Sequence, residues 1–466
     1  MVASLHELVA RKRGRMKPAV TPSEKVRRFT EHFRERLTRE QFASLAACAH
    51  CGLCAESCHY YLATKDPKMT PAYKADRIRR LFKHDFDWLG RRVPGWVGAG
   101  QVQTDEDLED LKDVVFGSCT ACRRCTFNCP FGVDMGALIW LARSCLIDER
   151  IAPAGILAVM KDQWETGNQM AVTPQHHMDT LKWLEEELQA AMDDPTAKVP
   201  IDKEGADFLY VVNPREVKFA PMSLLAAFKI FHAAKLDWTM GTVGWDNTNF
   251  GLFSADADLG AHMGRLAYEH AKKLRVRRLV VAECGHGWRS MKWEAPNWAN
   301  ANPLPFEIQS VLELMADLLS TGRIIVDPER NPHPVTYHDP CNLSRSSGIT
   351  EEPRFCLERS CKDFRDMVPN RTESFCCTGG GGAMSMPDYA KRRLSVSRIK
   401  ADQIRKTGAA FVATACHNCI DGLTDVIKEN KLRCEVGGKQ RLIPVKNVCE
   451  FVGDALVLPK APASKQ

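Results

Sequence analysis

Two cysteine runs of identical spacing constrain this fold more than any other feature of the chain. In each run two, two and three residues separate successive cysteines, and Pro130 directly follows the second run. Loops of this spacing wrap three thiolates around one face of an iron–sulfur cube, while the fourth cysteine reaches the partner cluster. The runs are CAHCGLCAESC, with Cys48, Cys51, Cys54 and Cys58, and CTACRRCTFNCP, with Cys119, Cys122, Cys125 and Cys129.

The exchange of the fourth cysteine assigns the eight thiols to two [4Fe–4S] clusters. Zinc is the alternative, but zinc prefers two separated cysteine pairs at tetrahedral spacing. His59 follows Cys58 where proline is usual, while Arg123 and Arg124 either place cationic charge beside a cluster or face solvent. One cluster would take Cys48, Cys51, Cys54 and Cys129, and the other Cys119, Cys122, Cys125 and Cys58.

Composition decides between metal and disulfides as the role of the nineteen cysteines. A chain of 466 residues can form two or three domains with their own cores, and a reducing cytosol would not maintain disulfides. The formal net charge of +6 is not concentrated in long basic runs, which argues against a nucleic-acid partner. Because no run of eighteen apolar residues and no signal peptide is visible, we expect a cytoplasmic chain without a membrane span.

The N-terminal part has helical apolar spacing. Residues 1–40 hold eleven Lys or Arg against five Glu, which predicts a basic arm that is either solvated or in contact with an anionic membrane face or acidic subunit. Ser23 is a candidate N-cap for a helix within this arm. We expect an α-helical ferredoxin-like domain over 41–195, followed by a polar linker at 193–207.

Short apolar strands alternate with helical stretches from residue 205 onward, so the expected fold class is α + α/β. Segments 245–288 and 374–419 share one order of helix, strand and cysteine, which predicts a duplicated α/β domain over 205–466. In the first copy Asn249 and Phe250 stand where the second has paired cysteines. The expected parts are a degenerate repeat over about 205–295, an intact repeat over about 330–425 and an extension over 426–466.

Five thiols gather in the intact repeat. Cys341 lies upstream, Cys376 and Cys377 are adjacent, and Cys416 and Cys419 follow downstream. A single cube takes four protein ligands, so five thiols suggest a cluster with a bridging thiolate.

Four glycines directly follow Thr378 after the paired cysteines. Gly379, Gly380 and Gly381, with Gly382, would let the backbone turn and leave room for a sulfur substrate. A phosphate-binding loop is disfavoured because no Gly-Lys-Ser/Thr follows, and the position of CHNC at 416–419 favours ligation over a thioredoxin-like dithiol.

This cysteine set resembles the CCG domain of heterodisulfide reductases, and the layout of two ferredoxin runs before a double repeat is similar over nearly the full length. Within that superfamily the chain looks most like the DsrK, HmeD and TmcB group of iron–sulfur subunits. The stretches that carry this resemblance are CHYYLATKDPKMTP (58–71), CTACRRCTFNCPFGVD (119–134), VAECGHGWR (281–289) and YHDPCNLSRSSG (337–348).

The resemblance implies one noncubane [4Fe–4S] cluster on the five cysteines, beside two [4Fe–4S] cubanes. It implies disulfide or trisulfide chemistry with a small sulfur-carrier protein of the DsrC type. It further implies a heme-b membrane subunit of the DsrM or NarI type, which would hold the chain at the inner face of the cytoplasmic membrane. The direction of electron flow stays open.

The degenerate repeat retains Cys284 and His286, which would lie near the substrate if the two repeats face each other. Either residue binds substrate sulfur or relays a proton, or both are a structural remnant. His338 and His417 are expected to donate to neighbouring cysteines. The cysteines without ligand spacing, expected to be buried or spare, are Cys145, Cys356, Cys361, Cys434 and Cys449.

Two other functions stay open at this point. An iron–sulfur subunit of a flavin-dependent hydroxyacid or glycerol-phosphate dehydrogenase would relay electrons to quinone without sulfur chemistry. A noncatalytic electron-transfer or assembly subunit would use the CCG domain as structure, although the complete set of five thiols argues against it.

Overall fold

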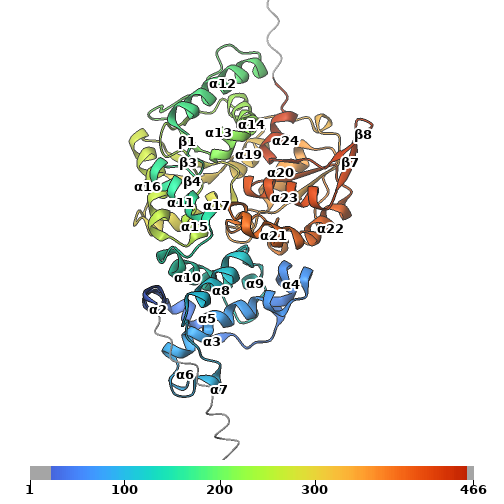
Figure 1. Ribbon diagram of the computed structural model, residues 1–466. Helices are drawn as coiled ribbons and strands as arrows, with labels where there is room; N and C mark the ends of the chain where they lie inside the picture. The colour runs from blue at the N-terminus through green and yellow to red at the C-terminus, as the bar shows by residue number, and fades with distance from the viewer. Residues whose placement is uncertain (1–22, 459–466) are drawn as a thin grey trace, which may run out of the picture.

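The computed structural model describes residues 23–458, in which a helical domain adjoins a larger α/β part (Figure 1). This architecture confirms the predicted combination of a helical domain with an α/β domain. Residues 1–22 of the expected basic arm lie outside the described residues. Within residues 23–458, no helix is both long and apolar enough to cross a membrane.

The helical domain is built around α10 (Met135–Asp148). Helix α2 (Glu24–Arg36) begins at the predicted cap, because the Ser23 hydroxyl accepts the backbone N–H of Val26 at 3.2 Å. Val26, Phe29 and Phe33 lie three and four residues apart, and this buried face packs against α10. The other helices are α3 (Arg39–Ala47), α4 (His59–Thr64), α5 (Pro71–Phe86), α6 (Trp88–Arg92), α7 (Pro94–Val97), α8 (Asp105–Lys112) and α9 (Arg124–Phe127), with the short turns η1 (Leu53–Ser57), η2 (Pro67–Met69) and η3 (Asp113–Gly117).

Two parallel sheets form the α/β part. The first has the order β2-β1-β3-β4 and the second the order β5-β6-β9, with Phe208 in register with Arg278 and Val335 with Phe411. β1 and β5 are buried along their whole length, as parallel strands covered on both faces are. The strands are β1 (Phe208–Val211), β2 (Trp238–Met240), β3 (Arg278–Val281), β4 (Glu307–Ser310), β5 (Val335–His338), β6 (Phe411–Thr414) and β9 (Val445–Lys446), with a separate hairpin of β7 (Arg433–Val436) and β8 (Lys439–Leu442).

Helices cover both sheets and join them into one core. α14 contacts α24 and α19 contacts α20, so helices of the first and second sheets pack together. The leucines Leu181, Leu184 and Leu188 of α12 also belong to this core. The helices are α11 (Ala154–Thr166), α12 (Pro174–Met192), α13 (Pro214–Phe219), α14 (Pro221–Ala233), α15 (Gly251–Ser254), α16 (Ala257–Leu274), α17 (Gly285–Arg289), α18 (Ala295–Trp298), α19 (Val311–Ser320), α20 (Glu351–Ser360), α21 (Ala390–Ser395), α22 (Arg398–Thr407), α23 (His417–Glu429) and α24 (Val448–Ala455), with the turns η4 (Ser290–Glu294), η5 (Pro328–Arg330), η6 (Arg371–Glu373), η7 (Ala383–Ser385) and η8 (Pro387–Tyr389).

Matching strands of the two sheets lead into matching helices. α17 begins after Cys284 at the end of β3, and α23 begins after Cys416 at the end of β6. β4 leads into α19 through a capping box at Ser310, and β9 leads into α24 through one at Asn447. The strand ends therefore present a cysteine at the same topological position of each sheet.

Arg143 on α10 ties the helical domain to both sheets. Its guanidinium is 2% exposed and donates to the backbone carbonyls of Val115, Cys119, Phe253 and Gly381 at 2.7–3.0 Å. The planar fork of arginine suits several acceptors at once. Burial lowers the pKa of Arg143 to about 10, so the side chain stays charged at neutral pH.

We expect Arg143→Met to lower the free energy of unfolding by about 3 kcal/mol, because four buried carbonyls lose a charged donor. Urea denaturation of the purified protein measures this loss. Arg398→Met, at an exposed position on α22, is the matched control and should change stability little. Equal stability of the two variants would contradict the assigned role.

Candidate functional site

Two small cavities of the helical domain are lined by the two predicted sets of thiols. The fourth cysteine of each run lines the cavity of the other run, and Cys125 lines both cavities. All eight cysteines are free thiols. One wall holds Cys48, Cys51, Cys54 and Cys129, and the other holds Cys58, Cys119, Cys122 and Cys125.

Local backbone turns and ion pairs shape the second run. Ala121 and Arg123 adopt positive φ values of +50° and +60°, which bend the loop between its cysteines. Arg123 pairs with Asp134, and the side chain of Arg124 donates to the carbonyl of Glu373 at 2.9 Å. Arg124 therefore connects the helical domain to the second sheet, rather than simply facing solvent.

Lys74 is a buried cation beside the second set that sequence patterns did not reveal. It is 2% exposed, and its Nζ lies 3.9 Å from Cys58 Sγ and donates to the Ser118 carbonyl. A buried charge requires compensation, which deprotonated cysteines of this set would supply.

Four of the five predicted thiols of the second sheet lie in one buried cluster. Cys377 Sγ lies 3.3 Å from Cys419 Sγ, and Cys376 and Cys416 belong to the same cluster. Hydrogen bonds with Cys376 and Cys419 hold the pKa of Cys377 well below its usual value. Burial, and then the nearby Cys376, raises the pKa of Cys341. We call these five residues the five-cysteine site.

The glycines after the paired cysteines permit close contact between domains. A Cβ on Gly381 would lie 2.6 Å from the carbonyl oxygen of Thr120, and one on Gly379 would lie 2.7 Å from that of Asn418. Gly380 faces the same Thr120 oxygen at 3.1 Å. Gly381 also has a φ of +65°. Protein backbone thus occupies the space that was expected to admit a substrate at these positions.

The second ferredoxin set touches the five-cysteine site directly. Cys122 packs against the buried cluster that holds Cys376, and its interaction with Cys376 raises the pKa of Cys122. Arg345 fixes this packing by donating to the carbonyls of Cys122 and Thr372, each at 2.6 Å. Clusters held by the two sets would therefore lie close together.

Cys284 and His286 lie beside Cys416 of the five-cysteine site. Cys284 Sγ is 3.3 Å from His286 Nδ1, and ligand atoms of all three buried residues lie within 4.8 Å of one another. Asn213 donates to Cys284 Sγ at 3.5 Å, and the ring of Phe253 lies 4.7 Å from that of His286. The two sheets thus face each other across this site.

The two histidines predicted to assist the cysteines differ in their surroundings. His338 lies within 4.8 Å of Cys377 and Cys419, and neither ring nitrogen has a hydrogen-bond partner among the described residues. Burial lowers the pKa of His338 well below its usual value. His417 Nε2 instead lies 3.2 Å from a Glu216 carboxylate oxygen and 3.1 Å from Asn447 Nδ2, so it does not serve a cysteine.

Lys400 on α22 is a further buried residue that the sequence analysis missed. It is 1% exposed, and burial lowers its pKa to about 8, opposed by the charges of Asp339 and Cys377. Five other thiols are buried, as expected for cysteines without ligand spacing: Cys145, Cys356, Cys361, Cys434 and Cys449.

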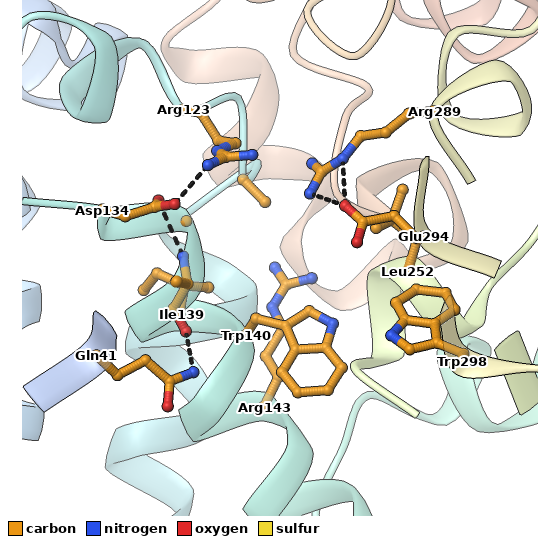
Figure 2. Close-up of a pocket in the computed structure, with 13 residues that line it drawn as sticks. Gln41, Arg123, Asp134, Ile139, Trp140, Arg143, Leu252, Arg289, Glu294 and Trp298 are labelled. Carbon is orange, nitrogen blue, oxygen red and sulfur yellow. Dashed lines mark hydrogen bonds and ion pairs between the residues drawn. The ribbon is translucent and has the colours of Figure 1, made fainter. Parts of the chain in front are cut away.

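A cavity of about 310 Å³ opens between the helical domain and the first sheet (Figure 2). Arg289, which lines this cavity, donates to the side chain of Asn342 at 3.3 Å, so the cavity adjoins the loop that carries Cys341. Its wall includes the ion pairs Arg123–Asp134 and Arg289–Glu294 and the rings of Trp140 and Trp298, stacked 6.4 Å apart.

Known families and proteins match the chain in both cysteine regions. The "4Fe-4S dicluster domain" matches residues 44–133, and the "Cysteine-rich domain" CCG matches residues 335–423. The chain is 28% identical to "Hdr-like menaquinol oxidoreductase iron-sulfur subunit 2" of Archaeoglobus fulgidus, over 88% of this chain and 79% of that protein. It is 27% identical to one subunit of the "Dihydromethanophenazine:CoB--CoM heterodisulfide reductase" of Methanosarcina barkeri, over 91% of this chain and 97% of that protein. The chain belongs to the heterodisulfide reductase-like superfamily of CCG-domain proteins.

This membership confirms the predicted family and makes the chain an iron–sulfur oxidoreductase subunit. A more distant relative is "Probable iron-sulfur-binding oxidoreductase FadF" of Bacillus subtilis, which is 22% identical over 86% of this chain and 59% of that protein. The relatives thus share the oxidoreductase character and differ in the reactions that their names state.

Gly381→Ala should destabilise the protein by at least about 2 kcal/mol more than Gly205→Ala. Both glycines have positive φ values, +65° and +72°, but only Gly381 faces a backbone oxygen, whereas a Cβ on Gly205 meets nothing within 4 Å. The pair therefore separates backbone strain from overlap with Thr120 in urea denaturation. Equal losses would show that the domains do not meet closely at this loop.

Proposed function

We propose that this chain cleaves or forms sulfur–sulfur bonds at the five-cysteine site, while two cubane clusters exchange single electrons with a membrane-side partner. The supporting observation is the buried set of thiols against which Cys122 packs, with Cys377 Sγ 3.3 Å from Cys419 Sγ and Cys284 within 4.8 Å of Cys416. In the reductive direction, one disulfide takes up two electrons and two protons and yields two thiols.

The donor sets fit iron–sulfur clusters. Free thiols line two small cavities, four in one and five in the other because Cys125 reaches both, and four buried thiols lie together with the half-buried Cys341 nearby without forming a disulfide. When bound, the clusters supply one-electron steps, and a noncubane centre couples them to the two-electron chemistry of sulfur. The proposed ligands are Cys48, Cys51, Cys54 and Cys129 for one cubane, Cys119, Cys122, Cys125 and Cys58 for the other, and Cys341, Cys376, Cys377, Cys416 and Cys419 for the noncubane cluster.

Cys284 and His286 would form the protein's contact with the substrate sulfur. His286 Nδ1 lies 3.3 Å from Cys284 Sγ, so the imidazole can accept or return a proton at that atom. Their burial excludes bulk water from the exchange. His338, whose nitrogens are unpartnered among the described residues, would donate to Cys377 or Cys419.

The proposed substrate is a disulfide or trisulfide on a small sulfur-carrier protein of the DsrC type. The proposed electron partner is a heme-b membrane subunit of the DsrM or NarI type, which would attach the chain to the inner face of the cytoplasmic membrane. The names of two relatives, a menaquinol oxidoreductase subunit and a heterodisulfide reductase subunit, support this pairing of quinol with sulfur chemistry.

We also propose that the α/β part is a duplication. The two strand orders match when β1, β3 and β4 are paired with β5, β6 and β9, and the bridge between Val335 and Phe364 takes the place of β2. The copies would then span 208–320 and 335–455, with the β7–β8 hairpin as an insertion. Because α12 packs on the first copy, the ferredoxin domain would end near residue 150.

The protein, purified anaerobically with its clusters, should reduce a synthetic disulfide peptide when a reduced viologen supplies electrons. Cys377→Ser should abolish this reaction, while the two cubanes should still accept electrons from the viologen stoichiometrically. Cys434→Ser makes the same chemical change at a thiol outside the site and should retain activity. An electron relay for a flavin dehydrogenase would instead accept electrons from a hydroxyacid through its flavoprotein and reduce no disulfide, which would contradict the proposal.

A further inference from the structure

The most exposed aromatic side chains of residues 23–458 lie on a short projection of the helical domain. Trp88 and Trp96 are 71% and 81% exposed, on α6 and α7. Every residue from 91 to 96 is exposed. Figure 1 shows α6 and α7 at the end of the molecule farthest from the two sheets. We call residues 86–97 the foot.

The foot is held by specific contacts and is not a loose loop. The backbone N–H of Val93 donates to the Leu89 carbonyl at 2.7 Å, and Lys83 Nζ donates to the Val97 carbonyl at 2.9 Å. Gly90 is buried, and a Cβ there would lie 2.0 Å from the Lys83 carbonyl oxygen. The fold therefore presents both tryptophans outward on a fixed support.

Unpaired positive charge accompanies the tryptophans. Among the described ion pairs, none joins Arg91, Arg92 or Lys83 to a carboxylate, and Arg91 donates to the backbone carbonyl of Asp85. The nearby acids are engaged elsewhere, because Asp85 pairs with α2 and Asp87 caps the start of α6. The exposed surface of the foot thus combines aromatic rings with cations.

We propose that the foot rests on the surface of an anionic lipid bilayer, with Trp88 and Trp96 at the level of the headgroups. Indole rings favour the membrane interface, where one side is apolar and the other wet, and arginines beside them attract anionic lipid. A small convex projection meets a deformable bilayer without needing a preformed pocket. This contact adds to, and does not require, attachment through a membrane subunit.

The contact would also orient the redox centres. Ala72 and Ala75 line the cavity of the first cysteine set, and α5 runs from there to Phe86 at the foot. At 1.5 Å per residue, the eleven residues after Ala75 span about 17 Å. The first cysteine set would therefore face the bilayer, and the two sheets would point away from it. This orientation does not depend on the proposed function, but its interpretation as an electron path from the membrane does.

Sedimentation of the full-length, cluster-loaded protein with lipid vesicles tests the proposal. The protein should bind vesicles of phosphatidylcholine with phosphatidylglycerol more tightly than vesicles of phosphatidylcholine alone. The double variant Trp88→Ala/Trp96→Ala should bind at least about tenfold more weakly, and Arg92→Gln about fivefold more weakly. Trp293→Ala, which removes a tryptophan that is 52% exposed on η4, is the matched control and should bind as the parent does.

Two results would overturn the proposal. Unchanged binding by the double variant would show that lipid contact lies elsewhere on the chain. No binding of the parent protein to anionic vesicles would leave the foot as a contact for a protein subunit. Iron content and disulfide reduction in solution are measured for each variant, because both should be unchanged, and so a failure of lipid binding is distinct from a failure of the sulfur chemistry.

Discussion

The contact between the second ferredoxin loop and the loop of paired cysteines is the interaction on which the rest of this structure depends. It requires glycine at residue 381, since a Cβ there would lie 2.6 Å from the Thr120 carbonyl oxygen, and a Cβ on Gly380 would be in tight contact with the same oxygen at 3.1 Å. Arg143 and Arg345 fasten the two loops by donating to backbone carbonyls on each side. As a result, two cysteine sets that lie more than 200 residues apart in sequence pack against each other.

Three buried cations surround this contact. Lys74, Arg143 and Lys400 are each at most 2% exposed, and none of them pairs with a carboxylate among the described ion pairs. Leaving a buried charge uncompensated is costly. Negatively charged thiolates or clusters would supply the missing counter-charge, so the protein is already shaped for a more anionic interior than its carboxylates provide.

The cysteine sets could be predicted from their spacing, and the helices and strands from the periodicity of apolar residues. Ser23 was recognisable as a cap because its hydroxyl acts within one turn of its own helix. The buried lysines were not recognisable, because Lys74 and Lys400 occupy ordinary positions on helices whose partners are distant in sequence. The packing of α12 on the first sheet and the role of Gly381 between domains could not be predicted either, because their partners are also distant in sequence.

Iron content and electron paramagnetic resonance of the anaerobically purified protein decide whether the five-cysteine site holds a third cluster. The spectra are recorded after mild thiol oxidation, for the parent and for Cys377→Ser. We expect about twelve irons, as three four-iron clusters require, and an oxidised-state signal that the substitution alters. About eight irons and no such signal would contradict this expectation, and would reduce the chain to a relay with two clusters.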